Sequence, residues 1–292
     1  MTRLIISFIT SISIAISIQS LSHGQLTPQT DIAEPGVPER HQEEYLLQDG
    51  SVMGFHFIKQ KPHFDVDRNR VFLSERYFPT WRDLLPDSRV YHLRGERGAN
   101  VDSQVFCWIF RDLETRNQYW PHPDRPSEKY LIERRKIDWL YQDSTFYLDN
   151  EGWVDSLSND YLVVACGKPV RNIWLTKGAV VGMHQMILKK DVQKEDFEQF
   201  IINVWSPNRS DALPGAKVFF LKGIRGPHQD VYFFLMVLQS MQVRDRYFPS
   251  LGGYSQDFLD HRANWEWLYS SDQLGQYLEQ FADEHSDFVV VK

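Results

Sequence analysis

The feature that most constrains the fold of this chain is an internal repeat at a constant spacing of 128 residues (182 minus 54). The repeated stretches are Gly54-x-His56 and Gly182-x-His184, Gly95-x-Arg97-Gly98 and Gly223-x-Arg225-Gly226, and Arg116-x-x-Tyr119 and Arg244-x-x-Tyr247. Near the end the spacing slips by one residue, because Asp160 matches Asp287. A register kept over this length predicts a tandem duplication, with units at 51–168 and 179–292 and a connector at 169–178.

Each unit shows the order strand, helix, strand, strand, helix, strand. Runs of β-branched and aromatic residues predict strands at 52–59, 89–94, 105–110 and 161–165, and again at 180–189, 217–222, 231–238 and 288–291. Apolar residues three and four apart predict a helix at 193–205, with its counterpart at 67–84. Asp112 and Ser240 are predicted N-caps of second helices. Further helices are predicted at 127–141 and 272–284, and the Gly-x-Arg-Gly stretches predict hairpin turns.

This order is that of a ferredoxin-like β-α-β-β-α-β unit, an α+β fold with helices on one face of an antiparallel sheet. The other face of such a sheet is apolar and has to be covered by a partner. Two units in one chain can cover each other. We therefore expect two sheets packed face to face as a pseudo-dimeric α+β barrel around an internal cavity.

The N-terminal segment predicts export. Arg3 precedes an apolar run at 4–21, and small residues at 22–24 precede a cleavage site, so residues 1–24 resemble a signal peptide. An uncleaved membrane anchor is the alternative, but serines interrupt the run. Residues 25–50 are polar and contain prolines, which predicts a linker or extended arm. The mature protein is thus expected to be periplasmic or secreted, without a stable membrane span.

Charge and cysteine content limit the partners. The net charge of −7 argues against a nucleic-acid partner, which would require a basic face. The chain contains Cys107 and Cys166, both inside apolar runs, which predicts buried free thiols.

The element order, together with Leu-Pro-x-x-basic-Val-aromatic-x-Leu-basic-Gly and Arg-x-x-Tyr-x-Pro, resembles the dimeric α+β barrel superfamily in a tandem-fused form. The resemblance spans residues 51–292 and identifies no particular member family. It implies a small, apolar or aromatic ligand and a pseudo-dimer within one chain, with a higher oligomer left open. Three functions follow: a cofactor-independent oxygenase or isomerase, a haem protein of chlorite-dismutase-like architecture, or a non-catalytic binding or interaction module. The haem histidine and distal arginine of that architecture have no matching position here.

His56 and His184 are the candidate catalytic residues, because they occupy the same place on the first strand of each unit. If that strand face points into the barrel, each imidazole could act as a general base in the cavity. The alternative is a hydrogen-bonded core histidine kept from the duplicated ancestor.

Arginine and aromatic residues are the candidate ligand contacts. Arg97 and Arg225 could hold an anion, although ion pairs with Asp102 and Asp230 are the favoured explanation. The aromatic candidates could roof a cavity, or equally well pack helices on the sheet; they are Tyr119, Tyr247, Trp139 and Trp267. No metal site is predicted, since no third ligand accompanies the short His-x-Asp pairs.

Overall fold

The computed structural model describes residues 47–60, 71–82, 84–101, 103–122, 125–142, 153–167, 175–250 and 252–291. The predicted signal peptide lies outside these ranges, as do most of the arm at 25–50 and most of the connector at 169–178. All described residues belong to a single unit that begins at residue 43.

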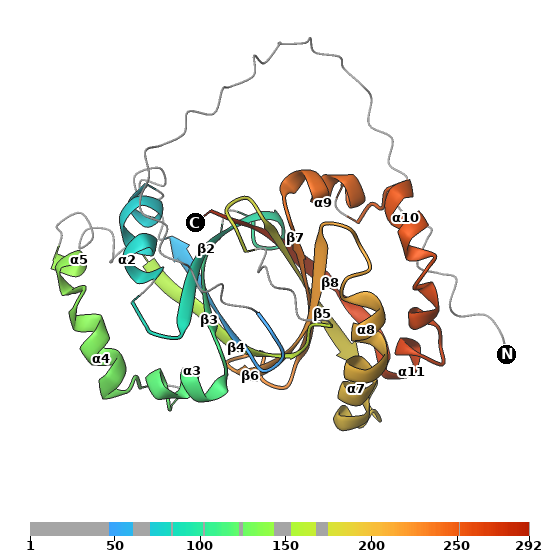
Figure 1. The fold of residues 1–292 in the computed structure, drawn as a ribbon, viewed down its shortest axis with the longest axis horizontal. Coiled ribbons are helices and arrows are strands. Elements are labelled where there is room, and N and C mark those ends of the chain that lie inside the picture. The colour runs from blue at the N-terminus through green and yellow to red at the C-terminus, as the bar shows by residue number, and fades with distance from the viewer. Residues whose placement is uncertain are drawn as a thin grey trace, which may run out of the picture. The chain divides into compact units, whose positions relative to one another are not determined.

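In the described residues, the strands form one closed antiparallel barrel (Figure 1). The first half contributes β1 (Val52–Gln60), β2 (Ser88–Gly98), β3 (Gln104–Phe110) and β4 (Trp153–Ala165). The second half contributes β5 (Val180–Leu188), β6 (Ala216–Arg225), β7 (Tyr232–Leu238) and β8 (Leu278–Val290). The order around the barrel is β1-β3-β2-β8-β5-β7-β6-β4. In both halves the third strand lies between the first and second, and the fourth lies on the other side of the first.

The two halves join edge to edge. β2 pairs with β8 through Arg97 and Asp287, and β4 pairs with β6 through Asp160 and Arg225. Pairing at both seams satisfies the backbone groups that an open sheet edge would expose. The expected pair of stacked sheets is thus corrected to a single sheet that closes on itself.

The repeated Gly-x-Arg-Gly stretches lie on these seams, and the hairpin turns follow them. A Cβ on Gly98 would lie 1.9 Å from the carbonyl oxygen of His285. A Cβ on Gly226 would lie 2.2 Å from that of Ser158. Both glycines also have positive φ, at +85° and +87°. Glycine is therefore required at both places for the backbones of the two halves to approach each other.

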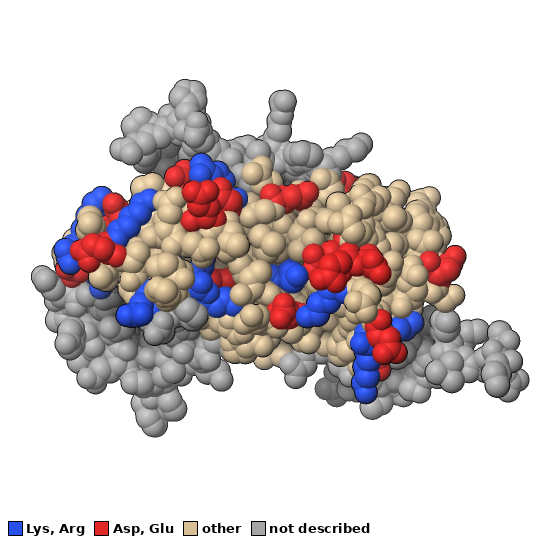
Figure 2. Space-filling model, turned by 90° about the horizontal axis from the view of Figure 1, so that it is seen from below, with Lys and Arg blue, Asp and Glu red and all other residues tan. Residues whose placement is uncertain are grey.

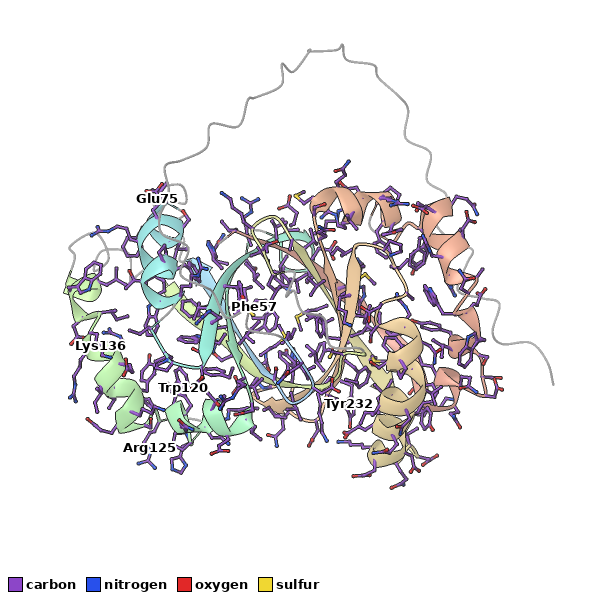
Figure 3. All side chains as sticks on the ribbon, viewed as in Figure 1. Phe57, Glu75, Trp120, Arg125, Lys136 and Tyr232 are labelled. Atoms are coloured by element: carbon purple, nitrogen blue, oxygen red, sulfur yellow. The ribbon has the colours of Figure 1, made fainter. Side chains whose placement is uncertain are left out.

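A continuous apolar cluster lies inside the barrel. Alternate residues of each strand point inward, as the two-residue period of a strand requires, and those of β1 and β5 include Met53, Phe55, Val181 and Met183. Phe57 lies within the ring of strands (Figure 3) and its ring is 5.9 Å from that of Phe288. The side chains that face the expected cavity are therefore mainly apolar.

Helices cover the outside of the barrel (Figure 1). The first half has η1 (Leu73–Tyr77), α2 (Phe78–Arg82), α3 (Leu113–Tyr119), α4 (Glu128–Arg135) and α5 (Asp138–Gln142). The second half has α7 (Lys194–Phe200), η2 (Ile201–Trp205), α8 (Ser206–Arg209), α9 (Met241–Tyr247), α10 (Gln256–Arg262), η3 (Glu266–Tyr269) and α11 (Leu274–Tyr277). Even the π-helical turns η1 and η2 keep the spacing of 128 (201 minus 73).

Between the sheet and the helices, each half has its own apolar cluster. The cluster of the second half is termed the second-half layer and includes Phe197, Trp205, Phe234, Phe258 and Trp265. These residues come from α7, η2, β7, α10 and the start of η3, so the layer spans the whole outer face of that half.

The predicted N-caps are confirmed, whereas the helix predicted near the C-terminus is only partly correct. Asp112 and Ser240 are N-caps as predicted, and their side chains accept hydrogen bonds of 2.7 and 3.2 Å from the backbone N–H three residues later. The helix predicted at 272–284 is wrong beyond Tyr277, because β8 begins at Leu278 and pairs with β5. Strand pairing in the barrel outweighs local helix propensity there.

Within the described residues, no helix is both long enough and apolar enough to span a membrane. Cys107 and Cys166 are buried free thiols, as predicted. Burial raises the pKa of Cys166 to about 12 and that of Cys107 further still, so neither is a thiolate at neutral pH. Figure 2 shows acidic and basic side chains interspersed over one face of the molecule.

Candidate functional site

The repeated histidines lie on the outer, helix-facing side of the barrel. In β5, Val181 and Met183 belong to the interior cluster, so His184 points to the opposite face. Its ring lies 6.1 Å from that of Phe234 in the second-half layer. His56 has the equivalent position in β1. The expectation that these rings point into the barrel is thus corrected, because strand alternation gives the interior to the apolar residues on either side.

Each histidine belongs to a small cluster of polar side chains, here called a niche, around the glycine two residues before it. A Cβ placed on Gly182 would lie 3.0 Å from Asp287 Oδ1 and 3.8 Å from His184 Nε2. Gly182 pairs with Asp287 across β5 and β8, so the carboxylate lies over the glycine. Residues two apart on a strand lie on the same face, so the Gly-x-His spacing places each histidine on the same face as its glycine. The Gly182 niche is the group of Gly182, His184, Arg244, His285 and Asp287.

The equivalent niche in the first half is closed by ion pairs. A Cβ on Gly54 would lie 3.0 Å from Asp160 Oδ1 and 3.5 Å from His56 Nε2. Arg116 donates a hydrogen bond through Nη2 to Asp160, and both side chains are less than a tenth exposed, at 6% and 8%. Arg225 Nε lies 3.8 Å from the same carboxylate. One guanidinium group is therefore hydrogen-bonded to this acid, and a second lies within ion-pair distance of it.

In the Gly182 niche the carboxylate is held more loosely. Arg244 Nη1 lies 3.9 Å from Asp287 Oδ2, and this buried nitrogen has no hydrogen-bond partner among the residues that the structure describes. Arg244 Nε instead donates to Asp245 Oδ1 at 2.9 Å. Asp245 also accepts a hydrogen bond of 2.7 Å from Arg97. The first half has the uncharged Asn117 at the position of Asp245 (245 minus 128). Asp245 thus accepts hydrogen bonds from both arginines whose repeat counterparts lie beside Asp160.

Burial sets the charge state of the Gly182 niche. It lowers the pKa of His184 to about 4, and the neighbouring His285 adds to this effect. The two rings stack with centroids 5.5 Å apart and planes 11° apart. Burial also raises the pKa of Asp287, while Arg244 opposes that rise. At neutral pH the niche therefore offers a neutral imidazole and a guanidinium nitrogen free to donate.

Sequence reasoning identified His184 but missed the other side chains of this niche. The recurrence of Asp160 as Asp287 was the available indication. It gave no contact with the histidine, because the two residues meet only when β8 pairs with β5.

Arg97 and Arg225 connect the two halves of the barrel. Arg97 Nη1 donates to the carbonyl oxygen of Phe248 at 2.8 Å. Arg225 Nη1 donates to the carbonyl oxygens of Trp120 and His122 at 3.2 and 3.0 Å. In each case the arginine comes from one half and the acceptor from the other. The hydrogen bonds of Arg97 and Arg225 to carbonyl oxygens therefore join the two halves.

The ion pair expected between Arg225 and Asp230 is wrong. Asp230 Oδ1 lies 3.9 Å from Lys194 Nζ, and Arg225 points across the seam towards Asp160. Asp102, the partner expected for Arg97, lies outside the described residues.

Tyr119 and Tyr247 serve packing. Both are fully buried, and their hydroxyls donate to the carbonyl oxygens of Pro86 and Pro214 at 3.1 and 2.9 Å. These bonds fix the second helix of each half to the Leu-Pro turn before the second strand. Of the two explanations left open for these tyrosines, the helix-packing one fits their contacts.

Trp139 and Trp267 lie at the surface. Their exposed fractions are 52% and 47%, so neither indole roofs a buried space. Trp120, which follows Tyr119 at the end of α3, packs against Trp108 and Phe110 (Figure 3).

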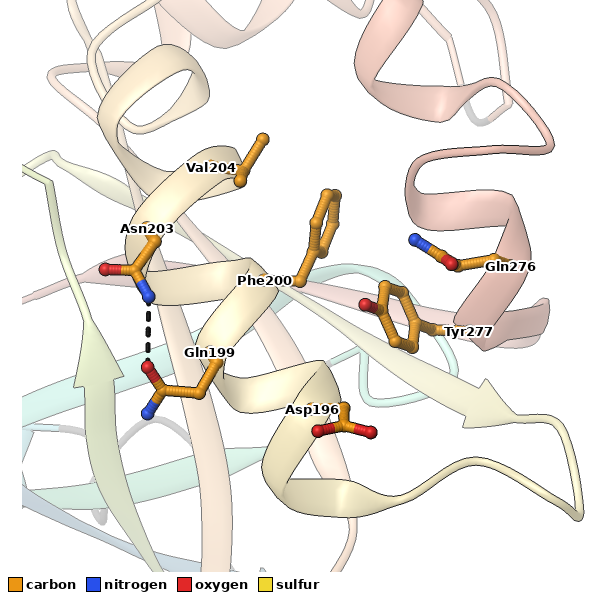
Figure 4. A pocket seen from close by; sticks show the side chains of 7 residues that line it. All are labelled: Asp196, Gln199, Phe200, Asn203, Val204, Gln276 and Tyr277. Carbon is orange, nitrogen blue, oxygen red and sulfur yellow. Dashed lines mark hydrogen bonds between the residues drawn. The ribbon is translucent and has the colours of Figure 1, made fainter.

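A surface groove of about 470 Å³ runs between α7–η2 and α11, at the outer edge of the second-half layer (Figure 4). Phe200 and Tyr277 face each other across it with ring centroids 5.1 Å apart. Its lining residues are Asp196, Gln199, Phe200, Asn203, Val204, Gln276 and Tyr277. The groove is thus aromatic at its centre and polar along its rim.

The residues described above form neither a metal site nor a haem pocket. Within the described residues, no group of three or more His, Cys, Asp or Glu side chains could hold a metal ion. A haem in the second-half layer would need a slot several rings wide between sheet and helices. Trp205 and Phe234 are 5.2 Å apart there, and Phe258 and Trp265 are 5.8 Å apart, so aromatic side chains occupy that space. The residues of this layer do not fit haem in this conformation.

Comparison with known proteins shows similarity only among solved structures. No protein-family model and no curated protein matches the chain. A putative monooxygenase from Lactobacillus acidophilus NCFM is 11% identical, with a TM-score of 0.44 and coverage of 84% of this chain and 95% of that chain. An anthrone oxidase-like protein is 10% identical, with a TM-score of 0.40 and coverage of 84% and 92%. A mutant chlorite dismutase from Candidatus Nitrospira defluvii in complex with cyanide is 8% identical, with a TM-score of 0.47 and coverage of 86% and 95%.

The closed antiparallel barrel of the described residues agrees with the α+β barrel expected from the sequence. No member family is identified.

Proposed function

We propose that this chain is an exported, small-molecule-binding α+β barrel protein built from two tandem ferredoxin-like units, and that its ligand binds at the Gly182 niche. Export rests on the N-terminal segment, and duplication rests on the repeated spacing and strand order. The observation that carries the ligand site is the buried Nη1 of Arg244, which has no hydrogen-bond partner within the described residues and lies 3.9 Å from Asp287 Oδ2. A buried donor without a partner is costly, by about 1–3 kcal/mol, and a ligand can relieve that cost.

The niche supports a ligand with an aromatic or apolar body and a polar group. Phe234 beside His184 supplies an aromatic wall, and the second-half layer behind it is apolar. The polar group would accept from Arg244 and donate to the neutral imidazole of His184. Such a combination of apolar walls and few directed polar groups is typical of small-molecule sites.

The activity that fits this site is a cofactor-independent oxygenase or isomerase reaction. In both, a base removes a proton from carbon, and the resulting anion either reacts with O₂ or is protonated elsewhere. His184 would accept the proton, and Arg244 would stabilise the substrate oxygen that gains charge. A resting pKa of about 4 makes His184 a weak base, so a hydrogen-bonding role in binding is favoured over proton transfer.

The test is ligand-observed NMR with a panel of aromatic compounds that carry a carbonyl or hydroxyl group. Binding to the unmodified protein is expected, and Asp245→Asn is expected to abolish it. This change removes no group from the niche; it frees Arg244 and Arg97 to close on Asp287, as Arg116 and Arg225 close on Asp160.

The matched control is the equivalent histidine. His184→Ala is expected to weaken binding of the same compounds, and His56→Ala to leave it unchanged. Equal effects of the two histidine changes, or full binding by Asp245→Asn, would refute the assignment of the ligand to the second half.

A second candidate function, an interaction module, is favoured by one observation. The equivalent residues Leu131 and Leu259 are exposed by 37% and 41%, and Trp139 and Trp267 by 52% and 47%, so each half presents a leucine and a tryptophan outward. Exposed apolar pairs of this kind are typical of protein contacts. Size-exclusion chromatography with light scattering, comparing the protein with Trp139→Ser and Trp267→Ser, tests whether these indoles mediate self-association.

A further inference from the structure

A buried arginine in the second-half layer has no counter-ion within the residues that the structure describes. Arg209 is the last residue of α8 and is only 2% exposed. Its guanidinium carbon lies 4.1 Å above the ring of Trp265 and 5.7 Å from that of Phe234. The proposed function makes no use of this side chain.

The polar atoms of Arg209 are incompletely satisfied. Its Nε and Nη1 are buried and have no hydrogen-bond partner within the described residues. Within the residues that the structure describes, no carboxylate oxygen lies within 4.0 Å of an Arg209 side-chain nitrogen. Contact with aromatic faces recovers part of the cost of burying the charge, but an isolated buried cation remains unfavourable until an anion pairs with it.

Two further donors in the layer are in the same condition. The Nε1 atoms of Trp205 and Trp265 are buried and have no hydrogen-bond partner in the described ranges. Trp265 stacks under Arg209, and Trp205 lies 5.2 Å from Phe234, the other ring beside the guanidinium. An indole N–H can only donate. The unsatisfied groups around Arg209 are thus all donors, and a ligand here must bring acceptors.

The first half shows what the same scaffold looks like without this charge. The residue equivalent to Arg209 is Trp81 (209 minus 128), which packs edge-on against Trp108 at 5.5 Å. The residue equivalent to Trp265 is Ile137 (265 minus 128), which has no polar atom. The charge of Arg209 is therefore present only in the second half, and the indole of Trp265 has no counterpart at the equivalent position of the first half.

From these contacts we infer that Arg209, together with the indole of Trp265 beside it, forms a buried binding site for a monovalent anion. One guanidinium carries one positive charge, so a singly charged group neutralises it, whereas a dianion would leave a buried negative charge. The anion is either a small inorganic ion or the carboxylate of an organic ligand.

The experiment measures thermal unfolding in sodium chloride, nitrate, formate and benzoate at matched ionic strength. The unmodified protein is expected to gain stability with the concentration of at least one anion. Arg209→Trp, which copies the first half, is expected to weaken the apparent affinity at least about tenfold, whereas Asp245→Asn should keep it. A response to chloride and nitrate points to an inorganic ion, and a response to formate and benzoate alone points to a carboxylate.

An independent measurement avoids the variants. Bromide should give anomalous density within hydrogen-bonding distance of Arg209 Nε or Nη1 in crystals of the unmodified protein, or formate should displace it there. The site is refuted if no anion raises the melting temperature, or if Arg209→Trp responds as the unmodified protein does. Because Asp245→Asn leaves Arg209 intact, failure of the anion site is distinguishable from failure of the Gly182 niche.

Discussion

His92 gives the sharpest quantitative prediction, because it is a buried, titratable side chain at a position where the second half has Phe220. The ring is 0% exposed and stacks on Phe78 with centroids 4.0 Å apart and planes 6° apart. Its Nε2 lies 2.6 Å from Gln104 Oε1, and its buried Nδ1 has no partner within the described residues. Burial lowers the pKa to about 4 from the usual 6.5, and nearby Arg94 adds to this lowering.

The sign and size of the effect follow from proton linkage. Between pH 6.5 and 4 the unfolded chain binds a proton at His92 and the folded protein does not, so the free energy of unfolding falls as the pH falls. The full difference of 2.5 pH units (6.5 minus 4) corresponds to about 3.4 kcal/mol at about 1.36 kcal/mol per unit. Between pH 7 and pH 5 alone, the expected loss is about 2 kcal/mol.

His92→Gln removes the titration and keeps an amide near Gln104. Urea unfolding at pH 7, 6 and 5 is expected to show the variant losing about 2 kcal/mol less than the unmodified protein between the extremes. His184, whose pKa is also lowered to about 4, is present in both proteins and cancels in the difference. Parallel stability curves across this pH range would refute the argument, whatever the variant's stability at pH 7.

Two further predictions concern the seam and the repeated tyrosines. Gly98→Ala is expected to destabilise the barrel by more than about 3 kcal/mol, because its Cβ would meet the carbonyl oxygen of His285. Gly50→Ala, with φ of +86° and nothing within 4 Å of the Cβ, should cost only about 1 kcal/mol, so equal costs in urea unfolding would contradict the steric explanation. Tyr247→Phe is expected to lower stability by about 1 kcal/mol through loss of the bond to Pro214, with an unchanged denaturant slope.

The sequence predicted structure correctly where a side chain bonds to the backbone a few residues away. The N-caps at Asp112 and Ser240 follow from side chains that bond to the backbone three residues on, which needs no distant partner. Strand positions followed from alternation. The start of β8 at Leu278 did not, since pairing with β5 stabilises a strand where the local sequence favours a helix.

The candidate site was predicted only in part, because its contacts also depend on strand pairing and packing in the barrel. The repeat singled out His184 and Arg97, but the face that carries His184 depends on which residues the barrel buries inside. Arg97 was expected to pair with a neighbour in its own unit, and it reaches Asp245 in the other. A contact between residues 148 positions apart has no trace in local spacing.

By itself, the sequence indicated which positions recur at a spacing of 128 residues and the order of the elements around them, because a recurring pattern is a property of the residues alone. Only the tertiary structure decided that the two halves pair along both edges of their sheets. It also decided that Asp160 lies beside Arg116 and Arg225. The tertiary structure likewise decided that Arg244 and Asp287 stay 3.9 Å apart and that Arg209 is buried with no counter-ion among the described residues. These differences arise from packing across the seam and against the helices, where a single carboxylate such as Asp245 redirects the charges of both halves.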